Sequence, residues 1–321
     1  MHMTFRRTLA AAAALLLPLA AAGCSIIAAD HAAKAAGSVQ ETSGAAPLPA
    51  EKADKLKDAL DACAAELNTY ADPAGYQSGT EFSAAIYERS SGRAWHYNPG
   101  GSYLEASLVK VPILLTLLRE ATQEQRDLTL EEEYQAVMMI EYSDNDATTA
   151  LYESVGGAPA LARTYALLGV ENTDAAEVWG VNSTGVEDQL RIARALLEGV
   201  DWIDPGLQEF AVDLMQNVDS GQRWGISAGA ADRGAEIALK NGWLQDDTLS
   251  WNVGSMGIVR AEGAEYAVVV LTSGTNTMEG GVSVVERVAR ILNSFVSTGS
   301  SSGSGPSDTG GPMWRAEGSE A

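Results

Sequence analysis

The sequence predicts an α+β fold: one antiparallel sheet assembled from amino- and carboxy-terminal segments and flanked by helices, with an all-α subdomain inserted between them. Two groups of strand patterns support this prediction, one over residues 80–97 and one over 237–272. Helix patterns fill the interval between the two groups. The two ends of the chain are therefore expected to meet in one sheet. A pocket is expected where that sheet joins the helical part.

The amino terminus has the features of a secretory signal over residues 1–23. Arg6 and Arg7 precede an apolar run at 9–22, and the small residues Ala-Ala-Gly precede Cys24. This ending resembles a bacterial lipobox, although alanine stands where leucine is more usual. The resemblance implies a secreted protein whose first mature residue, Cys24, is lipidated and anchors it to the outer face of the cell membrane. The paired arginines are compatible with general or twin-arginine export.

The composition limits the classes of partner that the protein can bind. The chain has 321 residues, of which 46% are hydrophobic and 20% are charged, and its net charge is −22. This length suffices for one large domain or two small ones. The acidic balance argues against binding to a nucleic-acid backbone and against electrostatic attachment to anionic lipid, because both need basic patches.

The first elements follow from local patterns. Residues 24–50 are rich in alanine, serine and proline and are expected to form a flexible tether. A helix is expected at 51–70, where leucines and Cys63 recur at helical spacing, so Cys63 is expected in the core rather than in a disulfide. A β-hairpin is expected from strands at 80–88 and 94–97.

The rest of the chain shows similar patterns. The folded domain is expected over 51–296, with its helical subdomain at about 111–230, and the polar tail 297–321 is expected to be disordered. Further helices are expected at 130–141, from about 143, and at 160–168, 185–198, 205–217 and 282–295, and further strands at 237–240, 250–259 and 266–272.

The central stretch of the sequence is 105–119, which is apolar almost all round from 108 to 118 and therefore predicts a helix buried among other elements. Ser107 and Lys110 lie three residues apart at its start, so they share one face. The helix dipole favours an anion there, and burial lowers the pKa of a lysine toward the range where it accepts a proton. The functional interpretation is a serine nucleophile beside a lysine base. The structural interpretation is a capping serine and a surface lysine.

Two further short patterns acquire meaning from their order. Ser-Asp-Asn at 143–145 falls between two expected helices, and Lys-Asn-Gly at 240–242 ends an expected strand. Taken alone, the first is a common turn or capping sequence and the second is a plausible hairpin turn. Ser-x-x-Lys on a helix, then Ser-Asp-Asn in an all-α region, then Lys-x-Gly on a late strand is the motif order of class A β-lactamases and penicillin-binding proteins.

The chain therefore resembles this superfamily of serine hydrolases over roughly residues 51–296. With its lipobox it is similar to β-lactamase-related lipoproteins of the actinobacterial type. Stretches at 128–134, 146–151 and 156–157 agree with the resemblance. It implies the β-lactamase/transpeptidase-like fold and chemistry that uses neither a cofactor nor a metal.

The resemblance also implies a role for each motif residue. Ser107 attacks a carbonyl of the substrate and forms an acyl-enzyme, and Lys110 accepts its proton. Ser143, helped by Lys240, passes a proton to the leaving nitrogen. Asn145 binds the side-chain amide of the substrate and contacts Lys110.

The same resemblance places the oxyanion hole and the substrate-binding strand. The backbone N–H groups of Ser107 and Trp243 are expected to bind the oxyanion, with Gly242 beside them. Asn241 stands where a threonine or serine is usual. Its amide can still donate to a substrate carboxylate, so binding is expected with an altered preference.

Deacylation is where the chain departs most from the family. Efficient class A β-lactamases use a glutamate on an Ω-shaped loop, with an asparagine four residues later, to activate the deacylating water. In this chain Glu177 and Asn182 are five residues apart. Glu177 is a candidate water-activating base, and a surface loop carboxylate is the alternative. Slow deacylation is the expectation. The short interval between the first two motifs also predicts a trimmed helical subdomain.

The expected function is hydrolysis of a β-lactam or a related cell-wall amide by a monomer that contacts membranes only through its lipid. A penicillin-binding D,D-peptidase acting on peptidoglycan peptides and a non-catalytic envelope binding lipoprotein are the alternatives. A Ser-His-Asp triad lacks a base, because His2 lies in the signal, His31 in the tether and His96 on an expected strand. No cluster in the sequence has zinc-ligand spacing.

Overall fold

A computed structural model of the protein describes residues 46–69, 76–261 and 263–299. The expected signal with Cys24, most of the expected tether and residues 300–321 lie outside the described residues. The described elements run from Ala46 to Gly299. They therefore begin inside the expected tether and extend slightly past the expected end of the domain.

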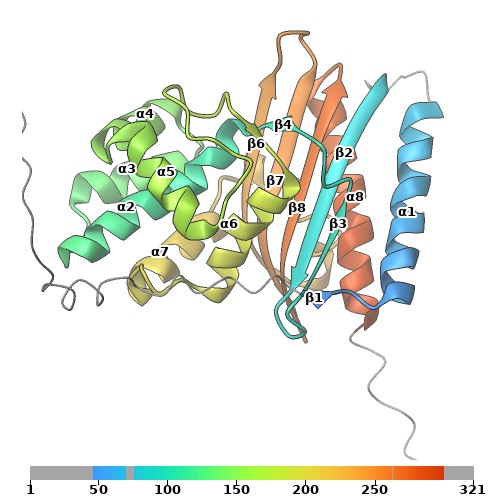
Figure 1. Ribbon diagram of the computed structural model, residues 1–321, viewed down its shortest axis with the longest axis horizontal. Helices are drawn as coiled ribbons and strands as arrows, with labels where there is room; N and C mark the ends of the chain where they lie inside the picture. Colours follow the sequence, from blue (N-terminus) through green and yellow to red (C-terminus); the bar gives the residue numbers. More distant parts are fainter. Residues whose placement is uncertain (1–45, 70–75, 262, 300–321) are drawn as a thin grey trace, which may run out of the picture. The chain divides into compact units, whose positions relative to one another are not determined.

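Within the described residues, six strands form one sheet that joins amino-terminal and carboxy-terminal segments, as the sequence predicts (Figure 1). Their spatial order is β1-β3-β2-β8-β7-β6. The antiparallel β2–β8 pair, with Glu88 opposite Tyr266, connects the amino-terminal strands to the carboxy-terminal ones. The short β1–β3 pair is parallel, so the sheet is mixed rather than purely antiparallel. The strands are β1 (Ala46–Pro47), β2 (Tyr76–Glu88), β3 (Arg93–Tyr97), β6 (Glu236–Gln245), β7 (Trp251–Ala261) and β8 (Ala264–Thr275).

Helices cover both faces of this sheet, and the apolar side chains between the layers form the core. α1 (Ala50–Thr69) and α8 (Met278–Gly299) lie together on one face (Figure 1). Cys63 is 2% exposed in this layer, which confirms its expected place in the core. α6 (Val186–Glu198) packs on the other face against β2, β7 and β8. Among the described helices, none is both long and apolar enough to cross a membrane.

The inserted helical part is built around α2 (Lys110–Glu124). Every residue from Lys110 to Arg119 is buried, as the apolar sequence predicts. Four helices pack against α2, namely α3 (Leu130–Glu141), α4 (Asn145–Ser154), α5 (Gly157–Leu168) and α7 (Pro205–Gln216). The start of the expected helix 105–119 is different, because Ala106–Val109 form a separate 3-10 turn, η1, ahead of α2.

The start of α3 shows how local sequence sets an element. Thr129 caps the helix by accepting a hydrogen bond from the N–H of Glu132, and the Glu132 carboxylate accepts one from the N–H of Thr129 in return. This reciprocal arrangement satisfies two helix-terminal donors. The helix therefore begins at Leu130, where its sequence predicts.

A second, two-stranded sheet has no signal in the sequence. β4 (Tyr103–Leu104) pairs antiparallel with β5 (Ser183–Thr184). Two-residue strands are too short to show an alternating pattern. The pairing ties loop 171–184 to the segment that leads into Ser107.

Candidate active site

Ser107 lies in the 3-10 turn η1, where the sheet meets the helical part. Ala106 before it has a left-handed backbone with φ of +49°, a conformation that costs a non-glycine residue about 1–2 kcal/mol. The turn lies against β6, because a Cβ atom added to Gly242 would be 2.9 Å from the backbone nitrogen of Ser107. Ser107 itself is partly exposed, as a nucleophile must be.

Lys110 is buried and hydrogen-bonded to the second motif. Its Nζ donates to the Ser143 carbonyl at 2.6 Å, to Ser143 Oγ at 3.0 Å and to Asn145 Oδ1 at 2.9 Å. Burial, partly offset by the carboxylate of Asp144, lowers the pKa of Lys110 to about 8. Deprotonation of Lys110 near neutral pH is therefore inexpensive, and the resulting amine has a lone pair that can accept a proton.

The third-motif lysine reaches the same hydroxyl. Lys240 Nζ donates to Ser143 Oγ at 2.9 Å and to the Asn241 carbonyl at 3.0 Å. Lys240 is fully buried, and burial together with the charge of Lys110 lowers the pKa of Lys240 well below its usual value. Because a hydroxyl accepts two hydrogen bonds and donates one, Ser143 keeps its own proton available for a third group.

The backbone of β6 beside η1 is the place expected for the oxyanion hole. Gly242 meets the backbone nitrogens of Ser107 and Leu108, each 2.9 Å from a Cβ built on it. Trp243 follows, and its ring packs against that of Trp224 with centroids 5.9 Å apart. Only a residue without a side chain permits this approach, so Gly242 sets the distance between strand and turn.

The contacts of Asn241 contradict its expected role as a donor to a substrate carboxylate. Its side chain is 1% exposed. Its Nδ2 donates to the carbonyl oxygens of Gln222 at 2.7 Å and Trp224 at 3.2 Å. Both amide protons are therefore engaged, and none is left for a substrate carboxylate. The amide holds the loop at 222–224 against β6.

Glu177 and Asn182 are not paired. Glu177 is exposed on loop 171–184, which fits the alternative of a surface carboxylate. Asn182 Nδ2 instead donates to Glu105 Oε2 at 2.7 Å. The asparagine of this loop is thus bonded to a different glutamate, one that precedes Ser107 by two residues.

Glu105 is a site residue that the sequence reasoning missed. It is 0% exposed, and its carboxylate accepts hydrogen bonds from Tyr165 Oη at 2.8 and 3.0 Å, from Asn182 and from Gln189 Nε2 at 3.1 Å. Burial raises the pKa of Glu105 to about 7 even though these donors favour the carboxylate. The available signal was a carboxylate at the start of an apolar run, two residues before Ser107.

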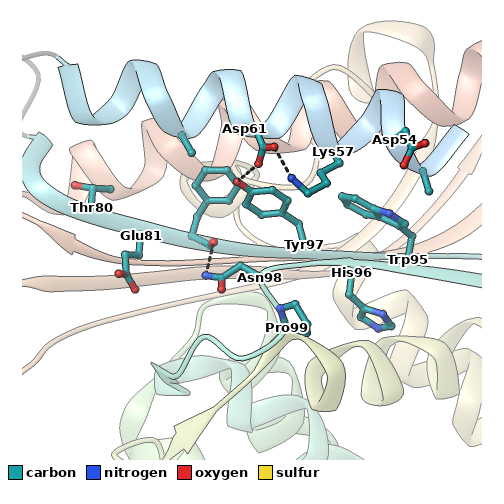
Figure 2. Close-up of a pocket in the computed structure, with 13 residues that line it drawn as sticks. Asp54, Lys57, Asp61, Thr80, Glu81, Trp95, His96, Tyr97, Asn98 and Pro99 are labelled. Atoms are coloured by element: carbon teal, nitrogen blue, oxygen red, sulfur yellow. Dashed lines mark hydrogen bonds and ion pairs between the residues drawn. The ribbon is translucent and has the colours of Figure 1, made fainter. Parts of the chain in front are cut away.

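His96 belongs to a different part of the molecule. It is among the residues that line a pocket of about 560 Å³ with Trp95 and Tyr97, but its side chain points away from α1, on the opposite side of β3 from theirs (Figure 2). The motif residues are not among those that line this pocket. Burial lowers the pKa of His96. Within the described part of the chain, no group of three or more His, Cys, Asp or Glu side chains is placed to hold a metal ion.

The comparisons with known proteins agree with this geometry. Residues 130–296 match the model of a family described as the β-lactamase enzyme family. The match includes the second and third motifs and begins after the first. A search of curated protein sequences finds no match.

Solved structures share the fold at low sequence identity. PBP-A has a TM-score of 0.63 and 19% identity, over 79% of this chain and 98% of its own. A PBP-A variant, solved as an acyl-enzyme complex with penicillin G, has a TM-score of 0.60 and 21% identity, over 74% of this chain and 97% of its own. A β-lactamase from Xanthomonas campestris pv. campestris has a TM-score of 0.64 and 16% identity, over 75% and 98%. The expected β-lactamase/transpeptidase-like fold is confirmed.

Proposed function

Because this chain belongs to the β-lactamase enzyme family, we propose that it is a serine hydrolase in which Ser107 forms an acyl-enzyme with a β-lactam or a related cell-wall amide. The observation that carries the proposal is the buried cluster in which Lys110 and Lys240 both donate to Ser143 Oγ, at 3.0 and 2.9 Å. Burying a charged lysine costs several kcal/mol. Buried groups with shifted pKa values are typical of sites where a reaction uses them.

Acylation begins with the neutral form of Lys110. As Ser107 Oγ attacks the carbonyl carbon, Lys110 takes the hydroxyl proton. A bond forms between Ser107 Oγ and this carbon, and the π bond of the carbonyl breaks and leaves its electron pair on the carbonyl oxygen. The negative charge that develops on the carbonyl oxygen is stabilised by the N–H groups of Ser107 and Trp243. Each such donor typically contributes about 10²–10³ in rate.

Collapse of this intermediate requires an acid. The carbon–nitrogen bond breaks, and the leaving nitrogen takes the proton of Ser143 Oγ. Lys110, protonated in the first step, or Lys240 returns a proton to Ser143, since both lie within hydrogen-bond distance of its oxygen. Asn145 holds Lys110 through its Oδ1, and its amide protons remain to bind the substrate.

Deacylation is expected to be slow, because the exposed Glu177 is not held in place as a base for water. The penicillin-binding D,D-peptidase alternative uses the same motifs. It is favoured by the likeness to PBP-A, a variant of which was solved as an acyl-enzyme with penicillin G. A non-catalytic binding lipoprotein has no need of two buried lysines on one hydroxyl.

We further propose that the protein is a secreted lipoprotein anchored through Cys24 and acts as a monomer on a small-molecule β-lactam or a peptidoglycan peptide. The support is the signal-like segment and the Ala-Ala-Gly-Cys ending. A net charge of −22 offers no electrostatic attraction to anionic lipid, so attachment depends on the acyl chains.

The direct test of the nucleophile is Ser107→Ala. The variant removes the only proposed attacking oxygen, so labelling by a fluorescent penicillin is expected to disappear while the folded protein remains. Ser91→Ala, at an exposed serine of the β2–β3 turn, is the matched control and should label normally. Covalent labelling of Ser107→Ala would remove Ser107 from the mechanism.

A further inference from the structure

Two backbone hydrogen bonds extend the contact of β4 and β5 to the turn of Ser107. Beyond the β4–β5 pair, the N–H of Glu105 donates to the Asn182 carbonyl at 2.9 Å, and the N–H of Ala106 donates to the Gly180 carbonyl at 2.9 Å. A Cβ atom on Gly180 would lie 3.0 Å from the Ala106 carbonyl oxygen. Segment 180–182 therefore lies against Glu105 and Ala106, the two residues that precede the proposed nucleophile.

The carboxylate of Glu105 reinforces this pairing from inside the protein. It accepts hydrogen bonds from Asn182 Nδ2 in segment 180–182 at 2.7 Å, from the hydroxyl of Tyr165 on α5 and from the side-chain amide of Gln189 on α6. Asn182 is thus held twice by Glu105, once through its backbone carbonyl and once through its side chain. The two contacts fix its position relative to Ser107.

The other end of the loop is held by a different buried carboxylate. Asp188, 1% exposed, accepts from the N–H groups of Glu171 at 3.0 Å and Asn172 at 2.8 Å. Tyr152 on α4 donates to the Ala176 carbonyl at 2.6 Å. The loop is therefore anchored at its start and in its middle without Glu105. The β4–β5 pair attaches the last residues of the loop, and the Glu105 carboxylate adds a side-chain contact to Asn182 next to the nucleophile turn.

We propose that Glu105 is a positioning residue of this site: through Asn182 its carboxylate holds residues 180–182 against the turn of Ser107, and the rate at which Ser107 is acylated depends on this hold. The inference rests on the proposed function. It assigns a role to a carboxylate that takes no part in the acylation steps described above.

The hold depends on the charge of Glu105. Protonation turns one acceptor oxygen into a donor, so the carboxyl can no longer accept from all its present donors. Burial and the neighbouring Asp188 raise the pKa of Glu105, to about 7, and Tyr165 and Tyr152 are the other titratable groups that face it. Acylation should therefore slow as pH falls through 7, separately from any change due to Lys110, whose pKa is about 8.

The test compares Glu105→Gln with wild type by the rate of labelling with a fluorescent penicillin between pH 5.5 and 9, using the full chain. The wild-type rate should rise with pH through two overlapping ionisation steps, the lower that of Glu105 and the upper that of Lys110, so that its logarithm climbs with a slope greater than one at the acid end. Glu105→Gln should label at least about tenfold more slowly, the equivalent of one lost hydrogen bond to a charged group, and should lack the lower step. Glu187→Gln, the same change at a partly exposed position of α6, should match wild type.

Asn182→Ala removes the other partner of the contact between Asn182 and Glu105. Asn182 is partly exposed, so this variant serves as the test if Glu105→Gln does not fold. It should also slow labelling, and the lower step should move to higher pH, because Asn182 is a donor that lowers the pKa of Glu105. A folded Glu105→Gln or Asn182→Ala protein with the wild-type rate and both wild-type steps would overturn the inference.

Hydrogen exchange separates failure of this inference from failure of the proposed function. The N–H groups of Glu105 and Ala106 should exchange at least about tenfold faster in Asn182→Ala. Their acceptors, the carbonyls of residues 182 and 180, lie in the segment that this substitution loosens. If wild type neither labels nor hydrolyses penicillin, the proposed function fails and exchange still measures the hold. Unchanged exchange at both amides would show that the hold does not exist.

Discussion

Ser143 Oγ couples the two lysines of the site, because it lies 3.0 Å from Lys110 Nζ and 2.9 Å from Lys240 Nζ. Like charges so close disfavour each other, and the charge of Lys110 adds to burial in lowering the pKa of Lys240. The motif spacing was sufficient to predict that these residues act together. It could not predict the contacts of Asn241 or Glu105, because their partners, the Gln222 carbonyl and Asn182, are brought to them only by the fold.

At this scale the pKa of Lys110 predicts a pH dependence. Lys110 accepts a proton only as the amine, so the labelling rate should rise as pH increases through about 8, where the group loses its proton. Lys110→Arg keeps a positive charge that cannot be removed, and labelling should fall by about 10²-fold or more. Lys57→Arg, on the exposed face of α1, should change nothing. A rate that is independent of pH between 6 and 9.5 would exclude Lys110 as the base.

At the scale of elements, the existence of β6 could be predicted from the sequence, but its length could not. The apolar pattern predicts a strand at 237–240, and Lys-Asn-Gly at 240–242 is, taken alone, a plausible hairpin turn. In the structure the strand continues to Gln245. Gly242 is required by the close approach of η1 rather than by a turn, and such a tertiary contact leaves no local signal. The pairing of β4 with β5 is missed for the same reason.

Gly242→Ala tests that approach. The added Cβ would lie 2.9 Å from two backbone nitrogens, which cannot move as a flexible side chain would. We expect a loss of stability of about 1–3 kcal/mol and at least about tenfold slower labelling, measured by thermal unfolding and by the fluorescent penicillin. Gly100→Ala is the control, because a Cβ there meets nothing within 4 Å. Equal labelling by both variants would show that the strand and turn tolerate a wider separation.

At the scale of the whole molecule, the sheet unites the two ends of the chain around the inserted helices. This much was predictable, because the strand patterns occur in two separated groups and the three motifs follow the order of a known family. The exact boundaries of the elements were harder to predict. Ala46–Pro47 adds a parallel edge strand within the expected tether, and α8 ends at Gly299 rather than near 295. Short edge strands and helix ends depend on tertiary packing more than on local sequence.

The proposed anchor also belongs to this scale. Cys24→Ser removes the thiol that lipidation requires, so the protein should move from the membrane fraction to the soluble fraction of cells that express it. Cys63→Ser, at the buried cysteine of α1, should leave membrane fractionation unchanged wherever the variant folds. Membrane association of Cys24→Ser equal to that of wild type would contradict the lipobox assignment.

The most direct test of the acyl-enzyme is the intact mass of the protein followed over time with benzylpenicillin. We predict that wild type gains the mass of one antibiotic molecule, that Ser107→Ala does not, and that the adduct is lost slowly. A hydrolysis assay on the same samples covers the case in which turnover is too fast for an adduct to accumulate. Neither an adduct nor hydrolysis of the antibiotic by folded wild-type protein would contradict the proposed reaction of Ser107 with β-lactams.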